Sequence, residues 1–370
     1  MGIIRLILAV SVVAAHAGSI FGFFTLLGGG VAVEVFFIIS GFYMALILND
    51  KYVGKGSYRL FFSNRLLKLY PTYLVVLILT VLISIVSFKL TSDGGFLSLF
   101  NLEENSIFSM LFLGLTNLSL LGQDIVMFLH IDNDGMLNFT SNFRDTNSPA
   151  YRMLAIPPAW SLSLELMFYL LAPFLVRLNY FKLSVVILIS LVLKIYILVG
   201  LGLFNDPWTY RFFPTELAYF LTGALCYKLY NALKGWKVGL QKSLGKWCFF
   251  LVFGTIIAYG FLPIHDLFKQ FIFFVIFVPS LPFIFSWSKS NKRDRFWGEL
   301  SFPVYISHWT IVSVLTFFNL DRIESAFSAM VIIVAILFSL ILNKYVMSPL
   351  ENFRQSRVKV NKYKVIKEVA

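Results

Sequence analysis

Long apolar runs separated by short polar stretches follow one another along almost the whole chain. The first run, Met1–Phe24, contains only two ionisable side chains, Arg5 and His16. A helix that crosses a bilayer needs about 20 predominantly apolar residues, at about 1.5 Å of rise per residue. Repeated runs of this length predict an all-α polytopic membrane protein. The first run is too long and continuous for a signal peptide, so we expect a retained helix.

Ten runs of this kind predict a bundle of about ten transmembrane helices. They are Met1–Phe24, Val31–Leu48, Tyr70–Phe88, Trp160–Val176, Leu183–Leu201, Phe212–Tyr230, Trp247–Leu262, Phe271–Trp287, Leu300–Leu320 and Ala326–Tyr345. Gly28–Gly30 is expected to form a tight turn after the first helix, and Asp50–Lys68 to form a polar loop. Pro71 then stands in the first turn of the third helix, where its missing N–H costs little.

The apolar segment 107–121 is ambiguous, because its roughly 15 residues are short for a span and include polar side chains. Charge decides between ten spans and eleven. With ten, most loops on the side of Arg5 are basic and the acidic segment 90–158 lies opposite. Because basic loops remain in the cytoplasm, we predict ten spans with both termini cytoplasmic and a re-entrant or interfacial segment at 107–121. A transmembrane domain, residues 1–351, is then followed by a basic cytoplasmic tail, residues 352–370, that faces membrane lipids.

Composition agrees with a membrane protein. The chain is 58% hydrophobic and 14% charged, whereas soluble domains have about 45–50% apolar and about 25% charged residues. The net charge of +12 would suit nucleic acid, but the basic residues collect in particular loops and follow membrane topology, so no nucleic-acid partner is expected. Cys226 and Cys248 fall in or beside predicted spans, which supports neither a disulfide framework nor a metal site.

The two ionisable residues of the first run share one face of the predicted helix. Eleven residues separate them, which at about 100° per residue returns His16 nearly above Arg5, about 16 Å along the axis. Arg5 then lies at one membrane surface and His16 near mid-depth. An imidazole in hydrocarbon is costly unless it faces protein or a cavity, which indicates a buried polar site. The alternative is a histidine that only bridges helices.

Other spans carry polar side chains at a similar predicted depth. Glu165 lies about 8 Å from the outer end of its span and shares a face with Ser161, four residues earlier. Ser301, Tyr305 and His308 form one stripe, with spacings of four and three residues. Glu34 lies near the outer end of the second span. Convergence in depth favours a shared cavity over scattered structural groups.

The stretch Tyr58–Pro71 is the counterpart on the inner side. Arg59, Arg65 and Lys68 lie within it, and guanidinium groups match phosphate oxygens well. They therefore suit a multiply phosphorylated ligand. The alternative is simple positive-inside anchoring.

Together these residues resemble the acyltransferase 3 family of integral membrane acyltransferases, in the family's order and over Ile3 to about Glu351. The similar segments are Arg5-x10-His16, GGGVAVEVFFIISGF (Gly28–Phe42), FFSNRLLKLYP (Phe61–Pro71), WSLSLELMFYLLAP (Trp160–Pro173), WGELSFPVYISHW (Trp297–Trp309) and the closing Pro349-Leu350-Glu351. Lys68 departs from the family's pattern, because relatives often have a second arginine there. A lysine weakens bidentate phosphate binding.

The resemblance implies an enzyme that transfers acyl groups other than aminoacyl groups, most often acetyl. The implied donor is cytoplasmic acetyl-CoA or another acyl-CoA, with no metal. The implied acceptor is a hydroxyl of a cell-surface polysaccharide or lipid-linked oligosaccharide, modified at the plasma (inner) membrane.

Residue roles follow from the same resemblance. His16 becomes the catalytic histidine, with Glu165 or Glu34 as the carboxylate that fixes its tautomer. The implied contacts of the acyl-CoA phosphates are Arg5, Arg65, Lys68 and, on the same segment, Arg59. The implied substrate and support residues are Trp160, Ser161, Tyr305 and His308.

Two routes remain open for His16. It either takes the proton of the acceptor hydroxyl during attack on the thioester, or it is itself transiently acylated. A different class of function is a transporter or flippase that uses buried His and Glu as a proton relay. A purely structural scaffold leaves the depth-matched ionisable residues without a role.

Overall fold

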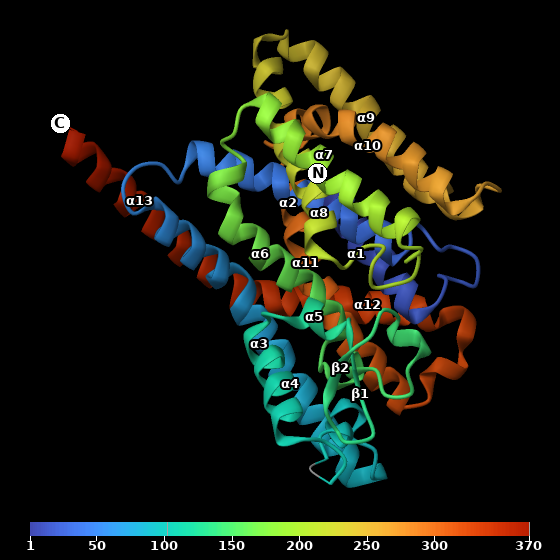
Figure 1. Cartoon of the computed structure of the whole chain (residues 1–370). Coiled ribbons are helices and arrows are strands. Elements are labelled where there is room, and N and C mark those ends of the chain that lie inside the picture. The colour runs from blue at the N-terminus through green and yellow to red at the C-terminus, as the bar shows by residue number, and fades with distance from the viewer. Residues whose placement is uncertain (102, 370) are drawn as a thin grey trace.

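The computed structural model describes residues 1–101 and 103–369, and it is a bundle of helices with one small sheet (Figure 1). The helices are α1 (Gly2–Ala17), α2 (Gly29–Asp50), α3 (Ser57–Thr91), α4 (Ile107–Ser119), α5 (Gln123–Val126), α6 (Trp160–Leu175), α7 (Tyr180–Ile195), α8 (Phe213–Ala232), α9 (Val238–Ala258), α10 (Asp266–Ser288), α11 (Lys292–Phe317), α12 (Glu324–Leu342) and α13 (Ser348–Val369). The strands β1 (Leu129–Ile131) and β2 (Leu137–Phe139) pair antiparallel.

The prediction of an all-α polytopic membrane protein is confirmed. Each of the ten predicted runs contains a helix, and 8 helices of the described residues are long and apolar enough to cross a membrane. The two others are α1, with 16 residues, and the more polar α8, with 20 residues. The chain is therefore a multi-pass membrane protein.

The first helix is shorter than predicted. The helix α1 ends at Ala17, and Gly18 follows with a φ of 92°, a backbone conformation that glycine adopts readily. The chain then turns back on itself, with Ile20 and Phe24 in an isolated bridge. His16 consequently lies in the last turn of α1 instead of near its middle.

The third helix begins earlier than predicted. The expected polar loop Asp50–Lys68 is mostly helical, because α3 runs for 35 residues from Ser57 to Thr91. Pro71 is thus inside the helix and not in its first turn. One backbone hydrogen bond is lost there, a cost that membrane helices tolerate when neighbours pack against the freed carbonyl. The early start gives Arg65 and Lys68 fixed positions on a helix.

The segment 107–121 forms the helix α4, whose 13 residues are too few to cross a bilayer at about 1.5 Å each. Asn117 fixes it to the loop before α6: its amide group donates to the carbonyl of Met153 at 2.9 Å and accepts from the N–H of Ala155 at 2.8 Å. With α5, β1 and β2 it forms one end of the molecule, beside α3 (Figure 1).

Two close helix pairs position the site. The helix α1 packs along α11, and α2 packs along α8. A Cβ atom at Gly41 would lie 1.7 Å from the carbonyl oxygen of Phe220, and one at Gly223 would lie 1.8 Å from that of Ile38. The close contact between α2 and α8 therefore requires glycine on both helices. Small residues let the backbones of membrane helices approach one another closely.

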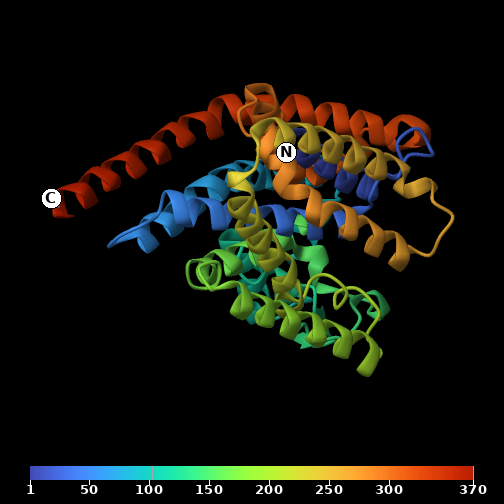
Figure 2. The same cartoon turned by 90° about the horizontal axis from the view of Figure 1, so that it is seen from above.

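The last two helices form one long rod. A π turn, Asn343–Met347, joins α12 to α13, and α13 extends beyond the bundle in both views (Figures 1 and 2). Its first turns pack on the N-terminal half of α3. The start of α1 contacts the start of α11, where Asp294 accepts from the N–H groups of Gly2 and Ile3 at 2.8 and 3.0 Å.

Candidate functional site

Two histidines from different helices are in direct contact. Nδ1 of His16, in the last turn of α1, lies 2.9 Å from Nε2 of His308 in α11. The two rings stack, with centroids 5.0 Å apart, and Trp309 packs edge-on against His16. His308 is fully buried, whereas His16 is exposed. The parallel packing of α1 on α11 sets this contact.

The hydrogen bonds of His308 fix the tautomers of both rings. Nδ1 of His308 lies 2.5 Å from the carbonyl oxygen of Tyr305, which can only accept, so this nitrogen carries the proton. In a neutral ring Nε2 of His308 is then an acceptor, and Nδ1 of His16 donates to it. Nε2 of His16 is left with its lone pair. This is the atom that can take a proton from a substrate.

The expected partner of His16 was a carboxylate, either Glu165 or Glu34, and this expectation is wrong. The neutral imidazole of His308 occupies the position beside Nδ1 of His16. An imidazole does the same orienting work, because it accepts the N–H and fixes the tautomer, and it adds no negative charge in an apolar environment.

Tyr305 and Ser161 lie one helical turn below the histidines. Their hydroxyl oxygens are 2.7 Å apart, and the Tyr305 hydroxyl donates to the carbonyl of Pro158 at 2.8 Å. Both side chains are buried. The predicted stripe Ser301–Tyr305–His308 is thus real: all three side chains are buried on α11.

A cavity of about 890 Å³ opens at the end of the bundle that carries Met1 and reaches Tyr305 and Ser161. Its volume falls within the range of about 300–1,000 Å³ typical of small-molecule and cofactor sites. Glu165 also lines it, and accepts from Ser40 at 2.7 Å and from the hydroxyl of Tyr169. The predicted common face of Ser161 and Glu165 is confirmed, whereas His16 and His308 are not among the lining residues.

Three predicted cations line this cavity: Arg5, Arg65 and Lys68. Arg65 is 6% exposed, and its Nε has no hydrogen-bond partner within the part of the chain that the structure describes. A buried guanidinium N–H without a hydrogen-bond partner is costly. It is therefore suited to an anion in the cavity. Arg59 lies on the exposed side of α3 and does not line the cavity.

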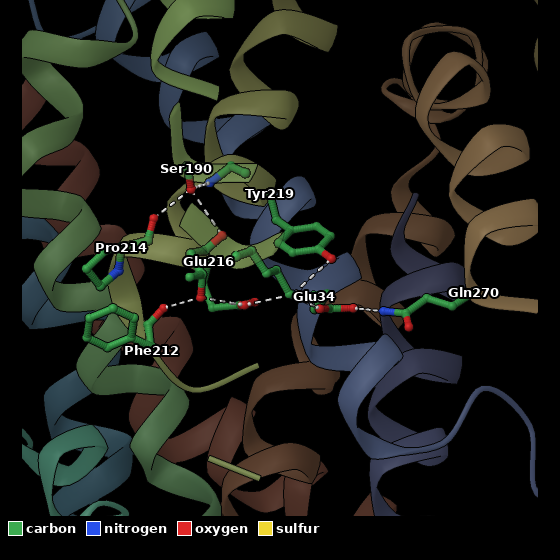
Figure 3. A network of polar contacts seen from close by, with 10 residues as sticks. Glu34, Ser190, Phe212, Pro214, Glu216, Tyr219 and Gln270 are labelled. Atoms are coloured by element: carbon green, nitrogen blue, oxygen red, sulfur yellow. Dashed lines mark hydrogen bonds and ion pairs between the residues drawn. The ribbon is translucent and has the colours of Figure 1, made fainter. Parts of the chain in front are cut away.

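Glu34 belongs to a different cluster, which lies between α2, α7, α8 and α10 (Figure 3). Nζ of Lys194 lies 2.8 Å from Glu34 and 3.1 Å from Glu216. Gln270 donates to Glu34 at 2.5 Å, and the hydroxyl of Tyr219 lies 3.2 Å from Lys194. A second cavity, of about 760 Å³, borders this cluster. The prediction of a single cavity for all the ionisable groups is therefore wrong with respect to Glu34, His16 and His308.

Sequence reasoning missed the partners of Glu34. Lys194 and Glu216 both stand inside predicted spans, and charged residues at that depth mark a paired or functional position. The presence of Lys194 and Glu216 within predicted spans was the sequence signal that could have revealed this cluster. Lys194 donates to Glu34, Glu216 and the hydroxyl of Tyr219, and Gln270 donates to the second oxygen of Glu34. Among the described residues, Oε2 of Glu216 has no hydrogen-bond partner.

We expect Lys194→Met to destabilise the fold more than Glu34→Gln does. The first variant leaves two buried carboxylates without their cation, at a cost of about 3–5 kcal/mol for a broken buried pair. The second keeps a hydrogen-bonding side chain at position 34. Thermal unfolding in detergent measures both. Equal unfolding midpoints for Lys194→Met and the wild type would contradict this assignment.

A second group that sequence reasoning missed surrounds Trp160, at the start of α6. The guanidinium carbon of Arg211 lies 4.4 Å from the centroid of the Trp160 ring and 4.7 Å from that of Tyr210. Arg211 also binds both carboxylate oxygens of Asp206, at 2.5 and 2.8 Å. Burial lowers the pKa of Arg211, but Tyr210 and Asp206 outweigh it, and the net pKa is raised. Burial, together with Asp206, raises the pKa of Tyr210 to about 12 despite the opposing effect of Arg211. Arg211 therefore stays charged above Trp160.

A family model described as an acyltransferase domain matches residues 1–344 of the chain. This chain belongs to the acyltransferase 3 family. An uncharacterized protein of Aquifex aeolicus (strain VF5) is 30% identical over 177 residues, which cover 45% of this chain and 75% of that protein. No solved structure matches the chain.

Membership in the family makes the protein an acyltransferase of the membrane, with an acyl donor and an acceptor. The matched residues include both histidines of the pair and both Tyr305 and Ser161. They also include every residue up to 344 that lines either cavity. It ends before α13 begins.

Proposed function

We propose that this acyltransferase moves an acyl group, most simply acetyl, from cytoplasmic acyl-CoA to a hydroxyl of an extracytoplasmic or lipid-linked glycan at the plasma (inner) membrane. The observation that carries the proposal is the chain His16–His308–Tyr305, which leaves one imidazole nitrogen of His16 free and ends at Tyr305, a residue that lines the cavity. A sugar hydroxyl is a poor nucleophile at neutral pH and needs such a base.

The cavity residues fit an acyl-CoA. Arg5, Arg65 and Lys68 line it, and Nε of Arg65, which has no hydrogen-bond partner among the described residues, is suited to a phosphate oxygen. The narrow pantetheine arm then extends toward Tyr305. The donor supplies the acyl group as a thioester, which is activated toward attack by a hydroxyl.

Within this proposal His16 acts through Nε2. It takes the proton of the acceptor hydroxyl while the oxygen attacks the thioester carbonyl, and it returns that proton to the departing sulfur. His308 accepts the N–H of His16 throughout and stabilises the imidazolium form. If His16 is instead transiently acylated, Nε2 is again the reacting atom. The exposed position of His16 leaves it open to an acceptor.

The hydroxyl groups of Ser161 and Tyr305, which line the cavity, supply donors for the developing oxyanion. The hydroxyl oxygens of Ser161 and Tyr305 lie 2.7 Å apart, and one of these hydroxyl groups can turn from its present acceptor to donate its O–H to a negatively charged oxygen. Trp160 and Arg211, stacked at 4.4 Å, offer a rigid aromatic and cationic surface for the acceptor. Glu165, which accepts from Ser40 at 2.7 Å, also lines the cavity.

The presence of acetyl esters on the host's glycans tests the proposal. Proton NMR of surface glycans is recorded from strains with and without the gene. We expect the O-acetyl signals to disappear without the gene while the amount of exported glycan stays the same. Loss of export, with acetylation of the remaining glycan intact, would contradict the proposal and support a carrier.

A further inference from the structure

The cavity described above extends beyond the family match. Residues after 344 line it as well, among them Leu350, Glu351, Arg354, Gln355 and Val358. They come from the first turns of α13. The segment expected to be a lipid-facing tail is therefore, at its start, a wall of the cavity.

Arg354 is the cation that α13 contributes. It is 6% exposed, and within the described residues its Nε has no hydrogen-bond partner. One of its amino groups lies 2.5 Å from Glu351, whose side chain is 44% exposed. Because that carboxylate is partly hydrated, the pair leaves much of the guanidinium charge available.

Polar contacts to α3 fix the position of Arg354. Arg357 donates to the side-chain oxygens of Asn64 at 2.8 Å and of Ser63 at 2.9 Å. Asn64 precedes Arg65 directly, and both Arg65 and Arg354 line the cavity. The docking of α13 therefore places its arginine beside the predicted phosphate contacts of α3.

Arg65, Arg5 and Arg354 each repel the ammonium group of Lys68, which Glu165 attracts. Among the described residues, the buried Nε atoms of Arg65 and Arg354 have no hydrogen-bond partner. Unit charges a few ångströms apart repel by several kcal/mol when they are partly shielded from water. A multiply charged anion bound between them removes this repulsion and satisfies the free donors.

We propose that α13 completes the donor site: Arg354 contacts a phosphate group of the bound donor, and the bound donor holds α13 against α3. This inference rests on the proposed function, because it takes the ligand to be a nucleotide with several phosphate groups joined to an acyl thioester. It adds a contact outside the family match and couples the position of the C-terminal helix to the presence of donor.

Titration calorimetry of the full chain in detergent, with CoA as the probe, tests the inference. Arg354→Met removes a charge-assisted hydrogen bond and is expected to raise the dissociation constant about tenfold or more. Lys359→Met is the matched control, because it also replaces a cation by methionine, on an exposed position of α13 that does not line the cavity. Its affinity should equal that of the wild type.

Arg65→Met separates this inference from the proposed function. If Arg65→Met weakens CoA binding and Arg354→Met does not, the role of α13 is overturned and the donor site stands. If neither variant weakens CoA binding, both the role of α13 and the proposed donor site are overturned. Should Arg354→Met not fold, Arg354→Lys serves instead. It keeps the charge but loses the planar fork, and a several-fold weaker affinity is expected.

Limited trypsin digestion supplies a readout that is independent of affinity. We expect saturating CoA to slow cleavage after Arg354 and Arg357 in the wild type, because bound donor holds α13 in place. In Arg354→Met the cleavage after Arg357 should no longer depend on CoA. Protection by CoA that is equal in Arg354→Met and wild type contradicts the coupling.

Discussion

Replacing His16 by glutamine is expected to lower the turnover of acyl transfer by about 10²–10⁴-fold, the usual contribution of a general base. Glutamine keeps a similar size and a hydrogen-bonding group beside His308, but it cannot take a proton. The cavity proposed to bind CoA does not include His16, so the dissociation constant of CoA should not change. Turnover is measured as labelled acyl group transferred to glycan by the purified protein.

His130→Gln is the matched control for this variant. His130 lies in β1, far along the chain from the histidine pair and paired through its backbone with Asn138. The same substitution there should leave both turnover and thermal unfolding unchanged. Wild-type turnover in a folded His16→Gln protein would remove His16 from the chemistry.

The two variants His308→Phe and His308→Gln are expected to differ. Phenylalanine fills the space but cannot accept the N–H of His16, so the tautomer is no longer fixed and turnover falls by about 10²-fold or more. Glutamine can present its carbonyl oxygen to Nδ1 of His16 and should retain much of the activity. Because His308 positions His16 without touching substrate, the Michaelis constant should stay nearly the same for both.

A plain packing role for His308 predicts another result. In that case phenylalanine, which suits an apolar core, would be tolerated at least as well as glutamine, whose amide is costly to bury. Turnover in the order His308→Phe above His308→Gln would therefore contradict the hydrogen-bond chain. Thermal unfolding of both proteins shows whether each is folded.

Several features could be predicted because they depend only on local pattern. Apolar runs of spanning length identify membrane helices, since lipid leaves the backbone few other ways to satisfy its hydrogen bonds. Spacings of three and four residues placed Ser161 with Glu165, and Ser301 with Tyr305 and His308, because helix periodicity is nearly constant. We expected Arg5, Arg65 and Lys68 on the inner side of the membrane. All three line the same cavity.

Other features could not be predicted because they depend on which helices touch. The contact of His16 with His308 requires α1 to pack in register along α11, and hydropathy carries no information about that packing. Glu34 was assigned to the histidine from the family resemblance and from its predicted depth, yet its ion pair is with Lys194, which also binds Glu216. Two helix ends were also predicted wrongly. A single glycine, Gly18, ends α1 within an apolar run, whereas α3 begins at Ser57, within the segment that was expected to be a polar loop.

The central claim is that a free nitrogen of His16 is the reacting atom in acyl transfer from a CoA thioester to a hydroxyl. Its most direct test uses reconstituted protein. Wild-type protein and His16→Gln are placed in proteoliposomes that contain the host's lipid-linked oligosaccharides, and acetyl-CoA labelled in the acetyl group is added. We expect alkali-labile label on the oligosaccharide with the wild type and almost none with His16→Gln. Equal labelling by the two proteins, or none by a wild type that binds CoA, would contradict the claim.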